Sequence, residues 1–256
     1  MTAPDSVASA APTVVLVHGA FADSSGWGGV IQRLTAAGVP AQAVSNPLRG
    51  ITADAAYVAS ALAQVPGPVL AVAHSYGGAV LTNAAARAGN VIGLVYVAAF
   101  APDEGEKLLE IENGSTDSVL NTALVERQYP AGQGTETLGE FSIDPAKFHD
   151  VFAADLPADQ AALMAATQRP VSALGFVEPN GTPAWQTLPS WAVVATGDHA
   201  AGADVVRSMA QRAGATVTEV EASHVVMISQ PQAVADVVLT ALDTLGHGAP
   251  DRAAAV

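Results

Sequence analysis

The sequence contains no cysteine, and it contains few basic residues. The first absence excludes a disulfide framework, a thiolate nucleophile and any zinc or iron–sulfur site built on cysteine. Basic residues are outnumbered by acidic ones, because the sequence has 10 Lys and Arg and 24 Asp and Glu, which gives a formal net charge of -14 at pH 7. Binding to phosphate backbones or anionic lipids depends on clustered Lys and Arg, so we expect neither nucleic acid nor a membrane surface as a partner.

Long hydrophobic runs are also missing. No uninterrupted apolar stretch reaches the ~18 residues that indicate a membrane-spanning helix, and residues 1–12 lack the features of a secretory signal. Half of the 256 residues are nevertheless apolar, which suits one domain with a large core. We therefore expect a soluble, cytoplasmic monomer or homodimer, with a single domain over 13–246 and loose tails at 1–12 and 247–256.

Short runs rich in Val, Ile and Leu recur along the chain without alternation of apolar and polar residues. This pattern is typical of strands buried on both faces, as in a parallel sheet covered by helices. Helical stripes lie between the runs, for example around Val30 and Leu34 and again from Val234 to Leu245. The alternation predicts βαβ units and a three-layer α/β sandwich of about six mostly parallel strands, expected at 13–17, 41–44, 68–73, 91–98, 191–196 and 216–220.

The regular alternation stops over residues 101–188, where Pro, Gly and acidic residues mix with short helical patterns at 118–127 and 158–168. We interpret this segment as a helical cap insertion. In open α/β sheets, ligands bind outside the carboxyl ends of the strands, so the cap is expected to cover that edge.

Ser75 stands in the sequence Ala73-His74-Ser75-Tyr76-Gly77-Gly78, between a predicted strand and a helical stretch of small residues. A nucleophile elbow needs such a sharp strand-to-helix turn, with small residues two places before and two places after the serine. Ala73 and Gly77 fill these places. An ordinary serine in a βα turn would look the same, so the rest of the motif order decides between the two.

Backbone N–H groups near the serine can form an oxyanion hole. Ala20, in His18-Gly19-Ala20-Phe21 after the first strand, offers one N–H, and Tyr76 offers the second. Two such donors stabilise the negative charge that develops on a carbonyl oxygen during acyl transfer. We interpret His18 as a residue that orders this loop and transfers no proton.

A serine nucleophile also needs a base, and the base needs an orienting acid. His224 follows the last predicted strand and precedes the final helix, which is the position expected of the histidine in an α/β-hydrolase. Asp198 follows the penultimate strand and is the favoured acid. Asp103, after the preceding strand, is the main alternative, and Asp204 is interpreted as a carboxylate at a helix start.

Four segments together resemble the small α/β-hydrolases related to plant methyl esterases and hydroxynitrile lyases. They are Val14-Val15-Leu16-Val17-His18-Gly19-Ala20-Phe21 with Trp27, the Ser75 segment, Tyr96-Val97-Ala98-Ala99-Phe100-Ala101-Pro102, and Ser223-His224 with Ser229-Gln230-Pro231. The resemblance implies a six-stranded sheet, a helical cap and ester hydrolysis without a cofactor. It is faint in the cap. The acid loop also departs from the family, because His199-Ala200-Ala201-Gly202 replaces the usual bulky aliphatic residue and Pro.

Two positions separate the activities of this family. Its hydroxynitrile lyases carry Thr in place of Gly19 and Lys in place of Val225, so the sequence favours ester hydrolysis. Perhydrolysis by the same triad is a possible side activity, and a non-catalytic receptor for a small ligand is the alternative from another class.

Other chemistries find no support. Phosphate-binding and His-Glu-x-x-His motifs are absent, and neither His149-Asp150 nor Asp198-His199 suggests a metal site, because adjacent side chains on an extended segment point to opposite faces. Phe21 and Trp185 are the predicted substrate-binding residues for a small or aromatic ester. Further candidates for an apolar pocket are Trp27, Tyr76, Phe141, Phe152, Leu156 and Met164.

Overall fold

The computed structural model describes residues 11–132 and 134–247. The predicted loose tails therefore lie almost wholly outside the described residues. Six parallel strands form the main sheet, in the order β2-β1-β3-β4-β8-β9. They are β1 (Thr13–Val17), β2 (Ala41–Val44), β3 (Val69–His74), β4 (Val91–Val97), β8 (Ser190–Ala195) and β9 (Thr216–Val220). The predicted fold class is thus confirmed, and every apolar run expected to be a strand lies in this sheet.

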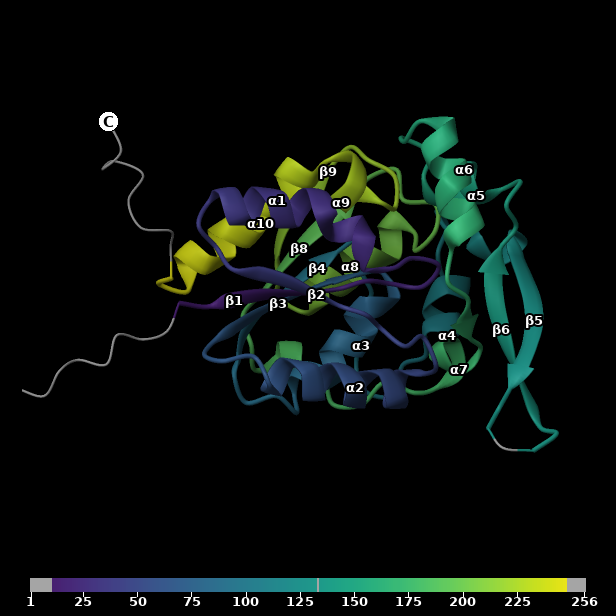
Figure 1. Cartoon of the computed structure of the whole chain (residues 1–256), viewed down its shortest axis with the longest axis horizontal. Coiled ribbons are helices and arrows are strands. Elements are labelled where there is room, and N and C mark those ends of the chain that lie inside the picture. The colour runs from purple at the N-terminus through teal and green to yellow at the C-terminus, as the bar shows by residue number, and fades with distance from the viewer. Residues whose placement is uncertain (1–10, 133, 248–256) are drawn as a thin grey trace, which may run out of the picture.

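Helices cover both faces of the sheet. In Figure 1, α1 (Gly28–Ala36) and α10 (Pro231–Thr244) lie on one side, and α2 (Ile51–Ala63) and α3 (Tyr76–Ala85) lie on the other. Two shorter elements, η1 (Ser24–Trp27) and α9 (Val226–Ser229), contact α1, and α8 (Ala203–Arg212) packs on β8 and β9. No helix of the described residues is both long and apolar enough to cross a membrane.

The centre of the molecule is the β3-α3 unit. All six residues of β3 and all ten residues of α3 are buried. A helix can lie this deep only if its polar side chains find partners, and Thr82 does so at 2.8 Å from the Tyr96 hydroxyl. Asn83 donates from Nδ2 to the Oδ1 of Asn180, which belongs to the segment between β4 and β8. The burial of this unit fixes the position of Ser75 at its turn.

The segment between β4 and β8 gathers at the end of the molecule to which the strands point (Figure 1). It holds the short helices α4 (Leu108–Asn113), η2 (Leu120–Thr122), α5 (Phe148–Phe152), α6 (Ala158–Thr167), α7 (Leu174–Val177) and η3 (Ala184–Gln186). It also holds a three-stranded antiparallel sheet of β5 (Leu124–Pro130), β6 (Thr137–Ile143) and β7 (Val171–Ser172).

This second sheet corrects one prediction. The expected helix over 118–127 is wrong, because residues 120–122 form a 3-10 turn and β5 begins at Leu124. Seven residue pairs join β5 to β6, so the conformation is set by its partner strand rather than by a local helical stripe. The expected helix at 158–168 is present as α6.

Candidate active site

Ser75 occupies a tight turn between the last residue of β3 and the first residue of α3. Its backbone has φ 54° and ψ -130°, which is an uncommon conformation for a residue other than glycine. Neighbouring backbone approaches so closely that a Cβ atom at Gly77 would lie 2.7 Å from the carbonyl oxygen of His18. The small residues around Ser75 therefore permit the turn, as expected for a nucleophile elbow.

A continuous chain of hydrogen bonds joins Ser75, His224 and Asp198. Ser75 Oγ lies 2.9 Å from His224 Nε2, and His224 Nδ1 lies 2.8 Å from Asp198 Oδ2. In the tautomer that satisfies both contacts, Nδ1–H donates to the carboxylate and Nε2 accepts from the serine hydroxyl. Each of the three residues follows the carboxyl end of its own strand, β3, β9 and β8 respectively, and all three are buried. The structure thus brings together three residues that are far apart in the sequence.

The other oxygen of Asp198 is held by the acid loop itself. Its Oδ1 accepts hydrogen bonds from the backbone N–H groups of Ala200 and Ala201, both at 2.9 Å. Asp103 lies elsewhere: its carboxylate accepts from the N–H of Glu104 at 2.8 Å and has no contact with His224 among the hydrogen bonds of the described residues. The geometry therefore joins Asp198, and not Asp103, to the histidine.

The two predicted oxyanion donors border the same cavity as Ser75. Tyr76 is the first residue of α3, where the helix provides no acceptor for its N–H, and Ala20 lies in the turn after β1. Within residues 11–132 and 134–247, neither N–H donates a hydrogen bond. Both are therefore free to meet an oxygen placed beside Ser75.

Two further histidines, His18 and His74, form hydrogen bonds with backbone next to the site. His18 Nε2 accepts from the N–H of Asn46 at 2.9 Å and faces Arg169 Nη1 at 3.2 Å, while Nδ1 lies 2.9 Å from the carbonyl oxygen of Gly19. Burial lowers the pKa of His18 to about 4, so the ring is neutral and orders the loop after β1. The contact with Arg169 could not be predicted from the sequence, because that residue comes from the segment between β4 and β8.

His74 also contacts His224, and the sequence predicts no role for it. Its Nε2–H donates to the backbone carbonyl of His224 at 3.0 Å, and the two rings lie 4.6 Å apart. Burial, together with the adjacent His224 ring, keeps its pKa well below the ordinary value. A neutral His74 therefore holds the backbone of His224 in place. The only feature of the sequence that indicates a place for His74 near the site is its position directly before Ser75.

The cavity at Ser75 is small. Its volume of about 10 Å³ is room for about one water molecule. Phe21, a predicted substrate-binding residue, borders this cavity, whereas Trp185, the other one, does not. Trp185 donates instead from Nε1 to the carbonyl oxygen of Pro102 at 3.1 Å, and η3, which carries this residue, contacts α3. The lining residues are Ala20, Phe21, Ser75, Tyr76, Phe100, Glu112, Leu120, Phe152, Phe176, Ala200, Ala201 and His224.

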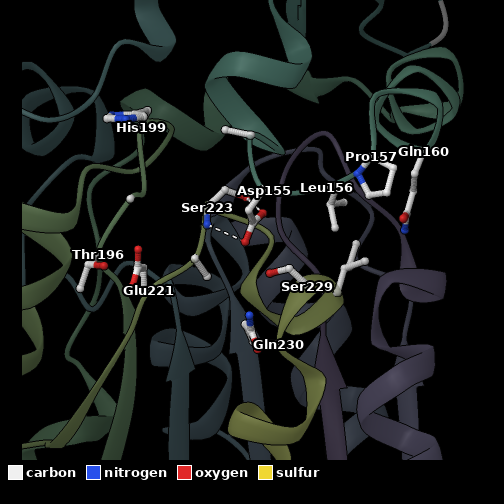
Figure 2. A pocket seen from close by; sticks show the side chains of 14 residues that line it. Asp155, Leu156, Pro157, Gln160, Thr196, His199, Glu221, Ser223, Ser229 and Gln230 are labelled. Carbon is white, nitrogen blue, oxygen red and sulfur yellow. Dashed lines mark hydrogen bonds between the residues drawn. The ribbon is translucent and has the colours of Figure 1, made fainter.

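A wider cleft of about 900 Å³ lies beside the loop that carries His224 (Figure 2). Ser75 is not part of its lining. Within it, Asp155 accepts from the N–H of Ser223 at 3.0 Å and also from the Ser223 hydroxyl. Burial raises the pKa of Asp155, but these hydrogen bonds outweigh it and leave the pKa below its ordinary value. An ionised Asp155 thus connects the segment between α5 and α6 to the residue next to His224.

Comparisons with known proteins agree with the fold. A family model described as "Alpha/beta hydrolase family" matches residues 14–237. Among solved structures, polyneuridine aldehyde esterase is 21% identical with a TM-score of 0.76, over 91% of this chain and 99% of that one. A pyrethroid hydrolase from Sphingobium faniae JZ-2 is 21% identical with a TM-score of 0.71, over 91% and 97%. A methylesterase from Arabidopsis is 18% identical with a TM-score of 0.73, over 91% and 99%.

At sequence identities of 18–21%, these three structures show that the fold is shared, and they carry no evidence about the substrate of this chain. A search of curated protein sequences found no match.

Proposed function

The chain belongs to the alpha/beta hydrolase family, and from this premise we propose that it is a serine hydrolase that cleaves small carboxylic esters. The observation that carries the proposal is the hydrogen-bonded chain from Ser75 through His224 to Asp198, which opens on an apolar cavity. The esterases and the pyrethroid hydrolase among the structural neighbours support the same reaction class.

The first half of the reaction forms an acyl-enzyme. Ser75 Oγ attacks the ester carbonyl carbon while His224 Nε2 takes the hydroxyl proton, and Asp198 stabilises the imidazolium that results. The N–H groups of Ala20 and Tyr76 bind the oxyanion. When the tetrahedral intermediate collapses, the C–O bond to the leaving group breaks and His224 gives its proton to the departing alkoxide.

Water completes the cycle. His224 Nε2 takes a proton from a water molecule whose oxygen attacks the acyl carbon, and the second tetrahedral intermediate expels Ser75 Oγ, which recovers the proton from His224. The products are a carboxylic acid and an alcohol, and the enzyme returns to its starting state. No step uses a group that the protein does not supply, apart from water.

Two features favour hydrolysis over cyanohydrin cleavage. A Cβ atom at Gly19 would lie 2.6 Å from Ser75 Cβ, so this backbone leaves no room for the threonine found there in related lyases. Val225, directly after the base, is fully buried and apolar, and it supplies no cation to a departing cyanide.

The test is the turnover of p-nitrophenyl acetate and butyrate by the wild type and by Ser75→Ala and His224→Ala. Each triad variant is expected to lose about 10⁴-fold or more in kcat, because the covalent route is closed. Ser60→Ala, at an exposed position on α2, is the matched control and should keep wild-type turnover. Wild-type turnover by Ser75→Ala, or tight ligand binding without turnover by the wild type, would contradict the proposal.

A further inference from the structure

Glu112 is a buried acid that the reaction steps above do not use. It lies near the end of α4, its exposed fraction is 3%, and it lines the same cavity as Ser75 and His224. Most of the other side chains around this cavity are apolar, including Phe100, Leu120 and Phe176. A carboxyl group in such a place needs hydrogen-bond partners, because buried polar groups are rarely left without them.

Among the described residues, only one of the two oxygens of this carboxyl group has a hydrogen-bond partner. Oε1 lies 3.2 Å from Ser118 Oγ, but that hydroxyl has a single proton and also donates to the carbonyl oxygen of Ala200 at 2.7 Å. One proton is thus shared between two acceptors, and the shorter contact goes to the carbonyl. Oε2 receives no hydrogen bond from the described residues, and none of their ion pairs includes Glu112.

The electrostatic surroundings leave this group able to donate as well as accept. Burial raises the pKa of Glu112 to about 7, with the hydrogen bond from Ser118 opposing the shift and the negative charge of Asp198 adding to it. Neutral and ionised forms therefore coexist near neutral pH. A neutral carboxyl group donates one hydrogen bond and accepts others, whereas the ionised form only accepts.

We propose that Glu112 is a specificity-determining residue that binds a hydroxyl group of the substrate, so that the preferred ester carries a hydroxyl on its acyl or alcohol arm. This inference rests on the proposed ester hydrolysis. A hydroxyl both donates and accepts, and it therefore pairs with Glu112 in either protonation state. An ammonium group fits less well, because it brings three donors to a cavity in which Glu112 offers one free oxygen. A hydrocarbon arm would leave the carboxyl group unpaired.

The test compares esters that differ only by a hydroxyl in place of a methyl group. For the acyl arm the pair is methyl 3-hydroxybutanoate and methyl 3-methylbutanoate, and for the alcohol arm it is 2-hydroxyethyl acetate and propyl acetate. Hydrolysis at pH 7 is followed by titration of the released acid. The wild type is expected to prefer the hydroxylated ester on one arm by about 10-fold or more in kcat/KM.

Variants assign that preference to Glu112. Glu112→Leu should abolish it, and Glu112→Gln, which retains a donor and an acceptor, should keep part of it. Glu110→Leu, at an exposed position on the same helix, is the matched control and should leave the preference unchanged. A wild type without preference on either arm, or a preference that survives in Glu112→Leu, would overturn the inference. So would a preference for methyl 3-aminobutanoate over its hydroxy analogue.

Binding to Ser75→Ala separates this inference from the proposed function. Calorimetric titration should show that this variant binds the preferred hydroxylated ester at least about 10-fold more tightly than its isostere, and that Glu112→Leu in the same background removes the difference. Such binding without any wild-type turnover would uphold the hydroxyl subsite and overturn ester hydrolysis. Turnover without the binding difference would do the reverse, and the absence of both would overturn both.

Discussion

Four residues other than glycine have positive φ angles in the described chain: Phe21 at 60°, Leu48 at 63°, Ser75 at 54° and Ala98 at 45°. Each lies in the segment that follows one of the strands β1 to β4. Such conformations cost on the order of 1–3 kcal/mol each and persist only where the surrounding structure enforces them. Backbone strain is therefore concentrated at the carboxyl edge of the sheet, which is also where Ser75 meets His224.

At the scale of single residues, the proposed acid of the triad gives a direct prediction. Asp198→Asn keeps the shape of the side chain but removes the charge that holds His224 in its tautomer, so kcat for p-nitrophenyl acetate should fall by about 10³- to 10⁴-fold. Asp103→Asn is the matched control, because its carboxylate contacts the exposed N–H of Glu104 and not the histidine. A large loss from the Asp103 variant with a small loss from the Asp198 variant would reverse the assignment.

Glu112 predicts a pH-dependent stability. Its pKa is raised from 4.5 to about 7 in the folded protein by burial, and Asp198 is the charged group that adds to the shift. The folded state therefore binds this proton more tightly than the unfolded chain does. The resulting stability is fully present below pH 4.5 and is lost as the pH rises through 7.

Glu112→Gln removes this titration. In urea unfolding, the variant should gain stability relative to the wild type by roughly 3 kcal/mol between pH 4.5 and pH 8.5. Glu110→Gln, on the same helix but exposed, should show no such change. If the difference between Glu112→Gln and the wild type is the same at both pH values, the raised pKa of Glu112 is contradicted.

At the scale of elements, the close packing of α3 against neighbouring loops depends on glycine. A Cβ atom at Gly78 would collide with the backbone carbonyl oxygen of Phe100 in the loop after β4. Gly78→Ala should therefore lower the free energy of unfolding by about 1–3 kcal/mol or more, because backbone rather than a flexible side chain must move. Gly28→Ala, at the start of α1, meets no atom within 4 Å and should be neutral or slightly stabilising. Equal effects at both positions would contradict this packing.

The elements also show which features could be predicted from the sequence. The central strands β3 and β8 are visible as apolar runs because both of their faces are covered, and Ser75 and Asp198 follow these two runs. His224 follows β9, an edge strand that is largely exposed and has a weaker apolar pattern. The β5-β6 hairpin could not be predicted in this way. Most residues of β5 are exposed and most of β6 are only half-buried, so the pairing leaves little apolar pattern in the sequence.

The side chains that line the cavity were harder still to predict. Trp185 and Glu112 both belong to the segment between β4 and β8, and their positions depend on how several short helices pack against one another. Trp185 is a plausible pocket residue from its aromatic side chain alone, but in the structure its indole N–H donates to the carbonyl oxygen of Pro102. The acid faces the cavity instead, which no local pattern indicates.

At the scale of the whole molecule, the segment between β4 and β8 closes the site almost completely. A cavity of about 10 Å³ has room for about one water molecule, so we expect lining side chains or the segment itself to move before an ester can bind. The wider cleft beside Ser223 is open but does not reach Ser75.

The whole molecule also carries a large negative charge, and this predicts a salt dependence. The formal net charge is -14, and four pairs between Lys or Arg and carboxylates are present in the described residues. Raising NaCl from about 10 mM to 150 mM shortens the Debye length from about 30 Å to about 8 Å and screens the self-repulsion. The melting temperature should rise by about 2–4 °C, and KCl should act in the same way. A fall in melting temperature would mean that the ion pairs outweigh the repulsion.

The central claim is that Ser75 is the nucleophile, and titration with diethyl p-nitrophenyl phosphate tests it most directly. The account predicts release of one p-nitrophenolate per chain, loss of hydrolysis of p-nitrophenyl acetate in the same proportion, and a phosphoryl group on the peptide that carries Ser75 by mass spectrometry. Ser75→Ala should show none of these changes. Full ester hydrolysis after stoichiometric labelling of Ser75, or inactivation that accompanies labelling at another residue, would contradict it.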